Sequence, residues 1–331
     1  MDFQVSEDQR ALAEGVRSFL AERLPDEELA RLAKSGGFDA GLWKELADLG
    51  VFSLRVDEAS GGVGLGFAEA VLVFEELGRR VAPGPLGWTH LASTSMENAA
   101  SGKTIVGGID RAGSHAGDPI LVEHLKSLDV LLVVDDDGIE RLDARELEGR
   151  PIAIPLDPLT PLHRLDRLPP GETIGGPAEA AQLRIEGAAL SAAQLLGIAE
   201  ETLSLAVDYA KQREQFGRAI GGFQALKHLM ADMFVRQEIA RCAVYAAGAT
   251  LDDPAVGSVA RAVSAAKLVA GDAAQRNAVA CIQVHGGMGF TWEVPAHYFL
   301  KRARVLENVF GSGSEHAERS ADFLSERAAA Y

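Results

Sequence analysis

The sequence predicts an α+β protein that is mainly α, with helices at both ends of the chain and a small β unit between them. Apolar residues recur at helical spacing over the first hundred residues and again after about residue 187. Between these parts, short β-branched runs alternate with Gly, Pro and Asp clusters. With 331 residues and 47% hydrophobic content, the chain can bury a core divided over two or three packed units. We place the domain boundaries at 1–100, 101–186 and 187–331.

Three helices are predicted in the N-terminal domain. The first follows Ser6, which forms a capping-box pattern with Gln9. The second is expected to begin near Asp39 and to end at Gly50, because glycine readily ends a helix. The third is the apolar stretch FAEAVLVFEELGRR, which follows the glycine-rich loop at 57–66.

The middle domain is predicted to be a compact β unit, and the C-terminal domain a set of long helices. The runs TIVGGI, PILVEHL, VLLVV and PIAI read as strands, separated by turn sequences such as DDDG and PLDPLTP. The helical segments lie at roughly 187–215, 221–250, 254–284 and 294–308, and Pro254 suits a first turn.

Charge and composition restrict the possible partners and the location. The formal net charge of -16 disfavours nucleic acid and anionic lipid surfaces, since both are negative. The N-terminus MDFQVSEDQR does not resemble a secretory signal, and no apolar run is long enough to span a membrane, so we expect a cytoplasmic protein. Cys242 and Cys281 fall in helical stretches without metal-site spacing. We interpret them as small core residues and expect no metal site.

The stretch YAKQREQFG ends the helical segment that precedes residue 217. Arg213 can present its guanidinium to a diphosphate there, Phe216 can offer a ring to a purine, and Gly217 lets the chain turn. An arginine at a helix C-terminus more often only complements the helix dipole, so this motif alone is a weak signal.

A second motif, QVHGGMGF, ends another predicted helix. Gln283 offers a donor and an acceptor, and the glycines at 286, 287 and 289 would let a ligand approach the backbone. Glycines at a helix end are also ordinary caps, and His285 is more often a packed or capping residue than a base. The chain has no GxGxxG after a strand, so a Rossmann site is not predicted.

Taken together, these segments resemble the acyl-CoA dehydrogenase family. DEASGGVG and FEELGRR are similar to its N-terminal helical domain; YAKQREQFG, FQALKHLMADM and QVHGGMGF are similar to its C-terminal four-helix bundle. The resemblance implies that FAD lies across a subunit interface. It also implies that Arg213, Phe216, Gln283 and Gly287 hold the diphosphate and adenosine of a flavin whose ring belongs to the partner, with Gln224 a weaker member of the set.

The sequence departs from the family pattern at the flavin ring. The family's β domain carries a Thr-Glu-Pro-x-x-Gly-Ser-Asp stretch that contacts the ring and the thioester, and nothing similar occurs between Leu86 and Ile185. We therefore expect that this chain does not hold an isoalloxazine of its own.

A second departure lies at the catalytic base. The family reaction removes the α-proton of an acyl-CoA with a carboxylate, but alignment from Pro295 places Phe310 in the glutamate position, or Gly311 after a one-residue slip. Counting back from Arg213 places Gly187 at the alternative base position of some members. Glu186 is one residue away, about 100° around a helix.

We interpret the remaining charged residues near the C-terminal motif as structural rather than catalytic. Glu307 and Glu315 are expected on a solvated helix face and in the first turn of the next helix. The cluster of Lys301, Arg302 and Arg304 is either a solvated face or an intersubunit surface, and we favour the solvated face.

The resemblance and the two departures identify the chain as similar to the base-less subunit of actinobacterial-type α2β2 acyl-CoA dehydrogenases. We expect it to complete the FAD site of a homologous catalytic subunit, which acts on an acyl-CoA, possibly a steroid side-chain CoA, and passes electrons to an electron-transfer flavoprotein. We assign no catalytic residue to this chain. Two alternatives remain: a homomeric dehydrogenase with Glu186 as base, and a non-enzymatic helical scaffold.

Overall fold

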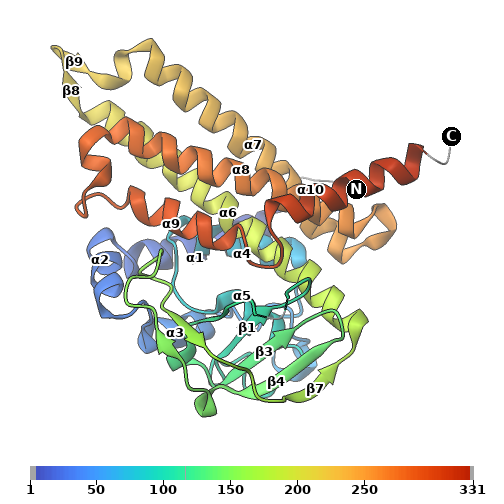
Figure 1. The fold of residues 1–331 in the computed structure, drawn as a ribbon. Coiled ribbons are helices and arrows are strands. Elements are labelled where there is room, and N and C mark those ends of the chain that lie inside the picture. The colour runs from blue at the N-terminus through green and yellow to red at the C-terminus, as the bar shows by residue number, and fades with distance from the viewer. Residues whose placement is uncertain (1–4, 116, 329–331) are drawn as a thin grey trace. The chain divides into compact units, whose positions relative to one another are not determined.

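The structure, a computed structural model, describes residues 5–115 and 117–328 (Figure 1). Contacts divide the chain into two compact units. Unit 1 comprises Met1–Ala30, Phe67–Ala82 and Ala188–Tyr331, and unit 2 comprises Arg31–Gly66 and Pro83–Gly187. The predicted α+β, mainly α fold is confirmed.

Unit 1 is helical. Helix α4 packs against both α1 and α7, and α8 packs against α7, α9 and α10. The helices of this unit are α1 (Glu7–Arg23), α4 (Phe67–Arg79), α6 (Pro177–Gln212, from Ala188 onward), α7 (Gln224–Asp252), α8 (Val259–His285), α9 (Ala296–Leu306) and α10 (Gly313–Ala328).

Side chains fix the starts of the two N-terminal helices of this unit. The Ser6 hydroxyl accepts a hydrogen bond from the Gln9 amide at 3.1 Å, and the Gln9 side chain accepts one from the Ser6 amide at 3.0 Å, so the predicted capping box is confirmed. At α4, the Asp252 carboxylate accepts bonds from the amides of Phe67 and Ala68 at 2.7 and 2.8 Å. This carboxylate satisfies two of the donors that a helix N-terminus leaves open.

Glycines let α4 and α6 approach each other closely. A Cβ on Gly197 of α6 would lie 1.9 Å from the Glu75 carbonyl oxygen, and a Cβ on Gly78 of α4 would lie 2.1 Å from the Gln194 carbonyl oxygen. Any larger residue at either position would push the helices apart. The distance between α4 and α6 is therefore set by backbone contact.

Unit 2 holds two β-sheets and the short helices α3 (Ala40–Asp48) and α5 (Leu86–Ala92). One sheet has the order β1-β3-β4-β7, in which only β1 and β3 are parallel, and the other has the order β2-β6-β5. The fully buried strand β3 reads VLLVV. The strands are β1 (Val106–Asp110), β2 (Ile120–Glu123), β3 (Val130–Val134), β4 (Ile139–Asp143), β5 (Arg150–Pro151), β6 (Leu162–Leu165) and β7 (Glu172–Gly175).

Several predicted elements need correction. Helix α2 (Asp26–Ser35) and helix α5 were not predicted, and α6 begins at Pro177, ten residues before the predicted start at 187. The first turns of α6 are rich in Ala, Glu and Gln, which favour a helix without forming an apolar stripe. Pro254 begins a short 3₁₀ helix, Pro254–Val256, rather than α8, and most of PIAI is not in a strand.

Among the described residues, one helix is long and apolar enough to cross a membrane by length and composition. This is α6, and 72% of its most apolar window is buried inside the protein. The core helix of a folded bundle satisfies the same criteria.

Candidate functional site

A tight hairpin follows α6 and carries the first motif. The Arg213 amide still donates to the Tyr209 carbonyl at 2.8 Å, and the Arg213 carbonyl accepts from the Ile220 amide at 2.8 Å. Between them, β8 (Glu214–Gln215) pairs with β9 (Arg218–Ala219). The backbone of Arg213 is therefore fixed on both sides while its side chain is exposed.

Phe216 and Gly217 form the two-residue loop of this hairpin. Their φ angles are +55° and +77°, as in a type I′ turn, which confirms that the chain turns at Gly217. The Phe216 side chain is 93% exposed. In β9 of the same hairpin, the Arg218 guanidinium lies 4.1 Å from the centre of the Phe223 ring and makes a cation–π contact with it. Phe216 thus presents an apolar ring to solvent, which is unusual for a large aromatic residue.

The end of α8 carries the second motif. His285 is buried, with Nδ1 2.8 Å from the Cys281 carbonyl oxygen, and its ring stacks on Tyr209 with centroids 4.2 Å apart. His285 is therefore a packed residue, as predicted. Because Tyr209 lies in the last turns of α6, this stack joins the two motifs, and Figure 1 shows the β8–β9 hairpin and the end of α8 at the same end of the bundle. Gln283 is exposed beside it.

The glycines after α8 serve different purposes. Gly289 is required by packing, since a Cβ there would lie 2.6 Å from the Ile282 carbonyl oxygen. Gly286 has φ +60°, and at both Gly286 and Gly287 an added Cβ would meet no described atom within 4 Å. The backbone at Gly287 is therefore open to an approaching ligand.

The structure brings the five predicted binding residues to one end of unit 1. Gln224 opens α7 directly after the hairpin and is exposed like the others. A guanidinium, two amides, an exposed ring and an open backbone are groups suited to a diphosphate and a purine nucleoside. This donor set fits the diphosphate and adenosine of FAD. A shared site would use Arg213, Phe216, Gln224, Gln283 and Gly287.

The loop after α9 contains the two possible base positions. Phe310 is buried at 3% exposure with φ +58°, and Gly311 has φ +100°. A Cβ on Gly311 would lie 2.9 Å from Nε2 of His316, whose Nε2 is also 3.1 Å from the Phe310 carbonyl oxygen. On the other side of the imidazole, Nδ1 lies 3.2 Å from the Ser264 hydroxyl. At neither position does this chain present a proton-accepting side chain.

Lys267 binds the backbone of the same loop. Its ammonium donates to the carbonyl oxygens of Leu306 at 3.0 Å, of Val309, and of Gly311 at 3.3 Å. The side chain is 1% exposed. A buried cation bound to backbone carbonyls at the end of a helix both satisfies those acceptors and complements the helix dipole. The loop is therefore fixed in the conformation that buries Phe310.

The remaining acidic candidates are bound to other groups. Glu186 accepts from Arg55 at 3.1 Å and, through its other oxygen, from Gln182 at 2.8 Å. Glu307 pairs with Arg304 at 3.6 Å. Glu315 accepts from the Ser312 amide at 2.6 Å, which confirms its place in the first turn of the following helix.

Two predictions about helix faces, one in α9 and one in α7, were wrong. Arg302 is 5% exposed and donates to the Ala82 carbonyl at 2.9 Å, so it does not lie on a solvated face. Cys242 is exposed, whereas Cys281 is buried as predicted. Both errors concern which side of a helix faces its neighbours.

Lys301, the first residue of the same charged cluster, lies 4.4 Å from the centre of the exposed Trp292 ring.

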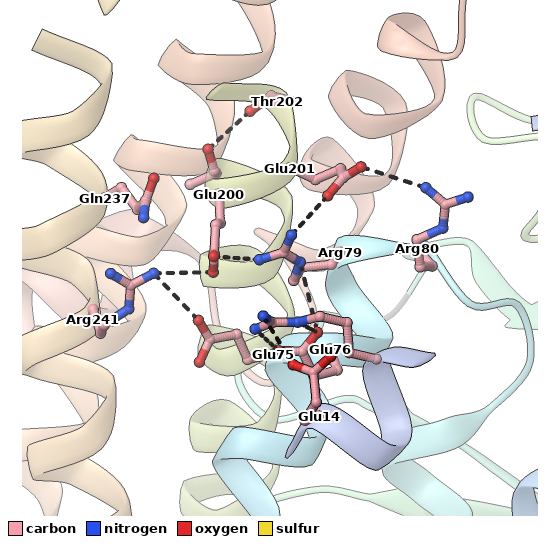
Figure 2. Close-up of polar contacts among 12 residues, drawn as sticks. Glu14, Glu75, Glu76, Arg79, Arg80, Glu200, Glu201, Thr202, Gln237 and Arg241 are labelled. Atoms are coloured by element: carbon pink, nitrogen blue, oxygen red, sulfur yellow. Dashed lines mark hydrogen bonds and ion pairs between the residues drawn. The ribbon is translucent and has the colours of Figure 1, made fainter. Parts of the chain in front are cut away.

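A cluster of buried and partly buried charges, shown in Figure 2, was not predicted from the sequence. Glu75, Glu76 and Glu200 lie among the arginines Arg17 and Arg241 in unit 1. The signal was present as charged pairs inside apolar helices, in FEELGRR and in LGIAEETL. Within the described part of the chain, no group of three or more His, Cys, Asp or Glu side chains is placed to hold a metal ion.

Comparison with known proteins gives matches over both ends of the chain and over nearly its whole length. The family model "Acyl-CoA dehydrogenase, N-terminal domain" matches residues 6–103, and "Acyl-CoA dehydrogenase, C-terminal domain" matches residues 180–324. Acyl-CoA dehydrogenase IpdE2 of Mycobacterium tuberculosis is 34% identical over 324 residues, covering 95% of this chain and 96% of that protein.

Two solved structures share the fold. The Tcur3481-Tcur3483 steroid ACAD G363A variant matches with a TM-score of 0.85 at 23% identity, covering 98% of this chain and all of that one. The ChsE4-ChsE5 complex from Mycobacterium tuberculosis matches with a TM-score of 0.82 at 24% identity, covering 98% of this chain and 99% of that one.

Proposed function

Since this chain belongs to the acyl-CoA dehydrogenase family, we propose that it is the subunit of a heteromeric acyl-CoA dehydrogenase that completes a partner's FAD site and supplies no catalytic base. The family consists of oxidoreductases with FAD as cofactor. Bound FAD supplies the acceptor for the hydride that leaves the β-carbon of the acyl-CoA. In this proposal, Arg213, Phe216, Gln283 and Gly287, with Gln224 as a weaker member, hold the diphosphate and adenosine end of the partner's flavin.

The observation that carries the proposal is the closed base loop. Phe310 is apolar and buried, and the space that a side chain on Gly311 would need is filled by His316. Removal of an α-proton requires a positioned carboxylate or another base within hydrogen-bond reach of that proton. We therefore propose that the base comes from another chain, a homologous catalytic subunit.

The relatives support a heteromeric assembly and a steroid substrate class. The names of the two solved structures denote a steroid ACAD formed from two proteins and a complex of two proteins. By analogy, we propose an α2β2 complex acting in the cytoplasm on the CoA thioester of a steroid side chain or a related acyl group. Electrons would then pass to an electron-transfer flavoprotein.

A homomeric enzyme with Glu186 as base is the alternative, and its geometry is less favourable. Both oxygens of Glu186 are engaged, one by a guanidinium and the other by an amide. A base must instead present a free oxygen to the substrate proton. A scaffold without cofactor would leave the exposed Phe216 ring and the open backbone at Gly287 without a purpose.

Flavin absorbance separates these possibilities. The chain expressed alone should purify without stoichiometric flavin, and co-expression with a homologous base-bearing subunit should give a yellow complex that reduces a dye on addition of acyl-CoA. A stoichiometric flavin spectrum from the chain alone would support the homomeric alternative. A complex that forms but binds no flavin would support the scaffold.

A further inference from the structure

Glu75 and Glu200 meet at a single guanidinium inside the helical unit. Nη2 of Arg241 lies 3.7 Å from one oxygen of Glu75 and 3.0 Å from one oxygen of Glu200 (Figure 2). The other Glu75 oxygen accepts a hydrogen bond from the Tyr245 hydroxyl at 2.8 Å. The Glu75 side chain is 4% exposed. Two carboxylates beside one partly buried arginine favour the loss of one negative charge.

The surrounding arginines compensate Glu200 more than Glu75, because Arg79 also binds the other oxygen of Glu200, whereas Arg241 lies 3.7 Å from Glu75. Arg17 donates to both oxygens of Glu76, at 3.0 and 2.7 Å. Glu201 lies 3.3 Å from Arg79 and 3.4 Å from Arg80. The charged groups that face the pair are Glu14 and Arg17 of α1, Glu76 and Arg79 of α4, Glu201 of α6, and Glu238 and Arg241 of α7, with Tyr245 as a neutral donor.

The helices cannot move apart to separate the carboxyls. Glu75 lies on α4 and Glu200 on α6, and Gly78 and Gly197 hold these two helices in backbone contact beside the pair. Close packing of this kind yields little to a local repulsion. Protonation is the remaining way to lower the electrostatic energy.

A water-accessible cavity reaches the pair. It has a volume of about 640 Å³ and is lined by Glu75, Glu200, Arg241 and Tyr245 on one side and by residues of α1, including Glu14 and Arg17, on the other. Water in this cavity could exchange a proton with the pair. Burial, followed by a hydrogen bond to Glu200, raises the pKa of Glu75 to about 8. Burial alone would raise the pKa of Glu200, but the bond from Glu75 and the guanidinium groups of Arg79 and Arg241 lower it.

We propose that Glu75 and Glu200 hold one proton between them at neutral pH. This proton stabilises the packing of α1, α4, α6 and α7, which therefore becomes sensitive to pH. When the pH rises, the Glu75 carboxylic acid gives its proton to water in the cavity and becomes a carboxylate. Glu75 and Glu200 are then both negative beside Arg241, and the four-helix contact weakens. The folded chain binds this proton more tightly than the unfolded chain does, so the contribution of this proton to stability is greatest at low pH and is lost as the pH rises through the folded pKa.

The direct test is infrared spectroscopy of the full-length chain as purified. The carbonyl band of a protonated carboxylic acid should be present at pH 7, disappear by about pH 9, and be missing at pH 7 in Glu75→Gln. Glu14→Gln, at the exposed rim of the same cavity, is the matched control and should retain the band. No such band in the natural chain at pH 7, or a band that survives Glu75→Gln, would overturn the proposal.

Thermal unfolding provides the second measurement. The midpoint for the natural chain and for Glu14→Gln should fall between pH 7 and pH 9, whereas Glu75→Gln, which copies the protonated form, should lack that fall. Parallel curves for Glu75→Gln and the natural chain would show that the pair does not control packing. If Glu75→Gln does not fold, the infrared band of the natural chain still decides the matter.

Discussion

The imidazole of His316 fills the space that a side chain on Gly311 would need. Its Nε2 lies 2.9 Å from the position of an added Cβ, and the same nitrogen is 3.1 Å from the Phe310 carbonyl oxygen. The loop in which the family's glutamate is expected is thus closed by a residue from the following helix, α10. Phe310 and Gly311 supply no base, and His316 occupies the space in which a larger side chain at position 311 would lie.

Substitution of Gly311 by alanine should destabilise the chain. The φ of +100° alone disfavours an L residue by about 1 to 3 kcal/mol, and the clash with His316 adds to it. Gly313→Ala is the control, since its added Cβ would meet only Glu307 Oε1, at 3.7 Å, and should change stability by less than about 0.5 kcal/mol. Chemical denaturation measures both. In Gly311→Ala with His316→Ala, the clash is relieved and the strain of φ remains, so part of the loss should return. Equal stabilities of the Gly311 and Gly313 variants would contradict this account of the loop.

Acid should destabilise the fold partly through two buried histidines. Burial lowers the pKa of His316, and that of His90, to about 4. Below the ordinary histidine pKa of about 6.5 the unfolded chain takes up protons that the folded chain does not, so stability falls as the pH drops from about 6.5 to 4. Each histidine contributes about 1.4 kcal/mol per pH unit to that fall. Denaturation curves at several pH values should show a smaller slope for His316→Gln, whereas the variant of exposed His115, His115→Gln, should keep the full slope.

Glu186→Gln should leave turnover of the assembled complex within a few-fold. Removal of a true general base lowers the rate by about 10² to 10⁴, but Glu186 is bound to Arg55 and Gln182. Dye reduction with acyl-CoA measures the effect. Arg55→Gln, which breaks the same ion pair from the other side, separates loss of the pair from loss of a base. A collapse with Glu186→Gln and full activity with Arg55→Gln would place the base in this chain.

Arg213→Ala should weaken flavin retention in the complex by about ten- to a hundredfold. Loss of a charge-assisted hydrogen bond to a phosphate corresponds to about 1.5 to 3 kcal/mol. The fold should be unaffected, since the side chain is exposed at a helix end. Lys211→Ala removes a nearby exposed cation that already pairs with Asp208 at 3.8 Å, and serves as the control. Titration of the apo complex with FAD gives both affinities, and equal affinities would assign Arg213 only to the helix dipole.

Local features were predictable from the sequence, because neighbouring residues decide them. The Ser6 cap, the turn at Gly217 and the helix end at Gly50 all follow from residues within a few positions. The common location of the proposed binding residues at the bundle end was predictable for the same reason, since each belongs to a short motif at the end of a helix.

Features that depend on distant contacts were not predictable. Arg302 is buried because the Ala82 carbonyl accepts from it, and the pair of Glu75 and Glu200 exists only because α4 and α6 pack together. Periodicity locates an apolar face but does not show which charges a neighbouring helix will receive. The side chain that blocks Gly311 also lies outside the loop motif, in the following helix.

The tip of the β8–β9 hairpin shows a conflict between folding and function. A type I′ turn favours Asn or Gly at both central positions, yet Phe216 stands there with φ +55° and its ring in water. Asparagine at position 216 would relieve the backbone and remove an exposed apolar surface, so the natural residue is a poor choice for the folding of the isolated chain. Proteins keep such choices where activity requires them. Optimising this chain for thermal stability alone would therefore select against Phe216, and with it the ring proposed to hold the adenine.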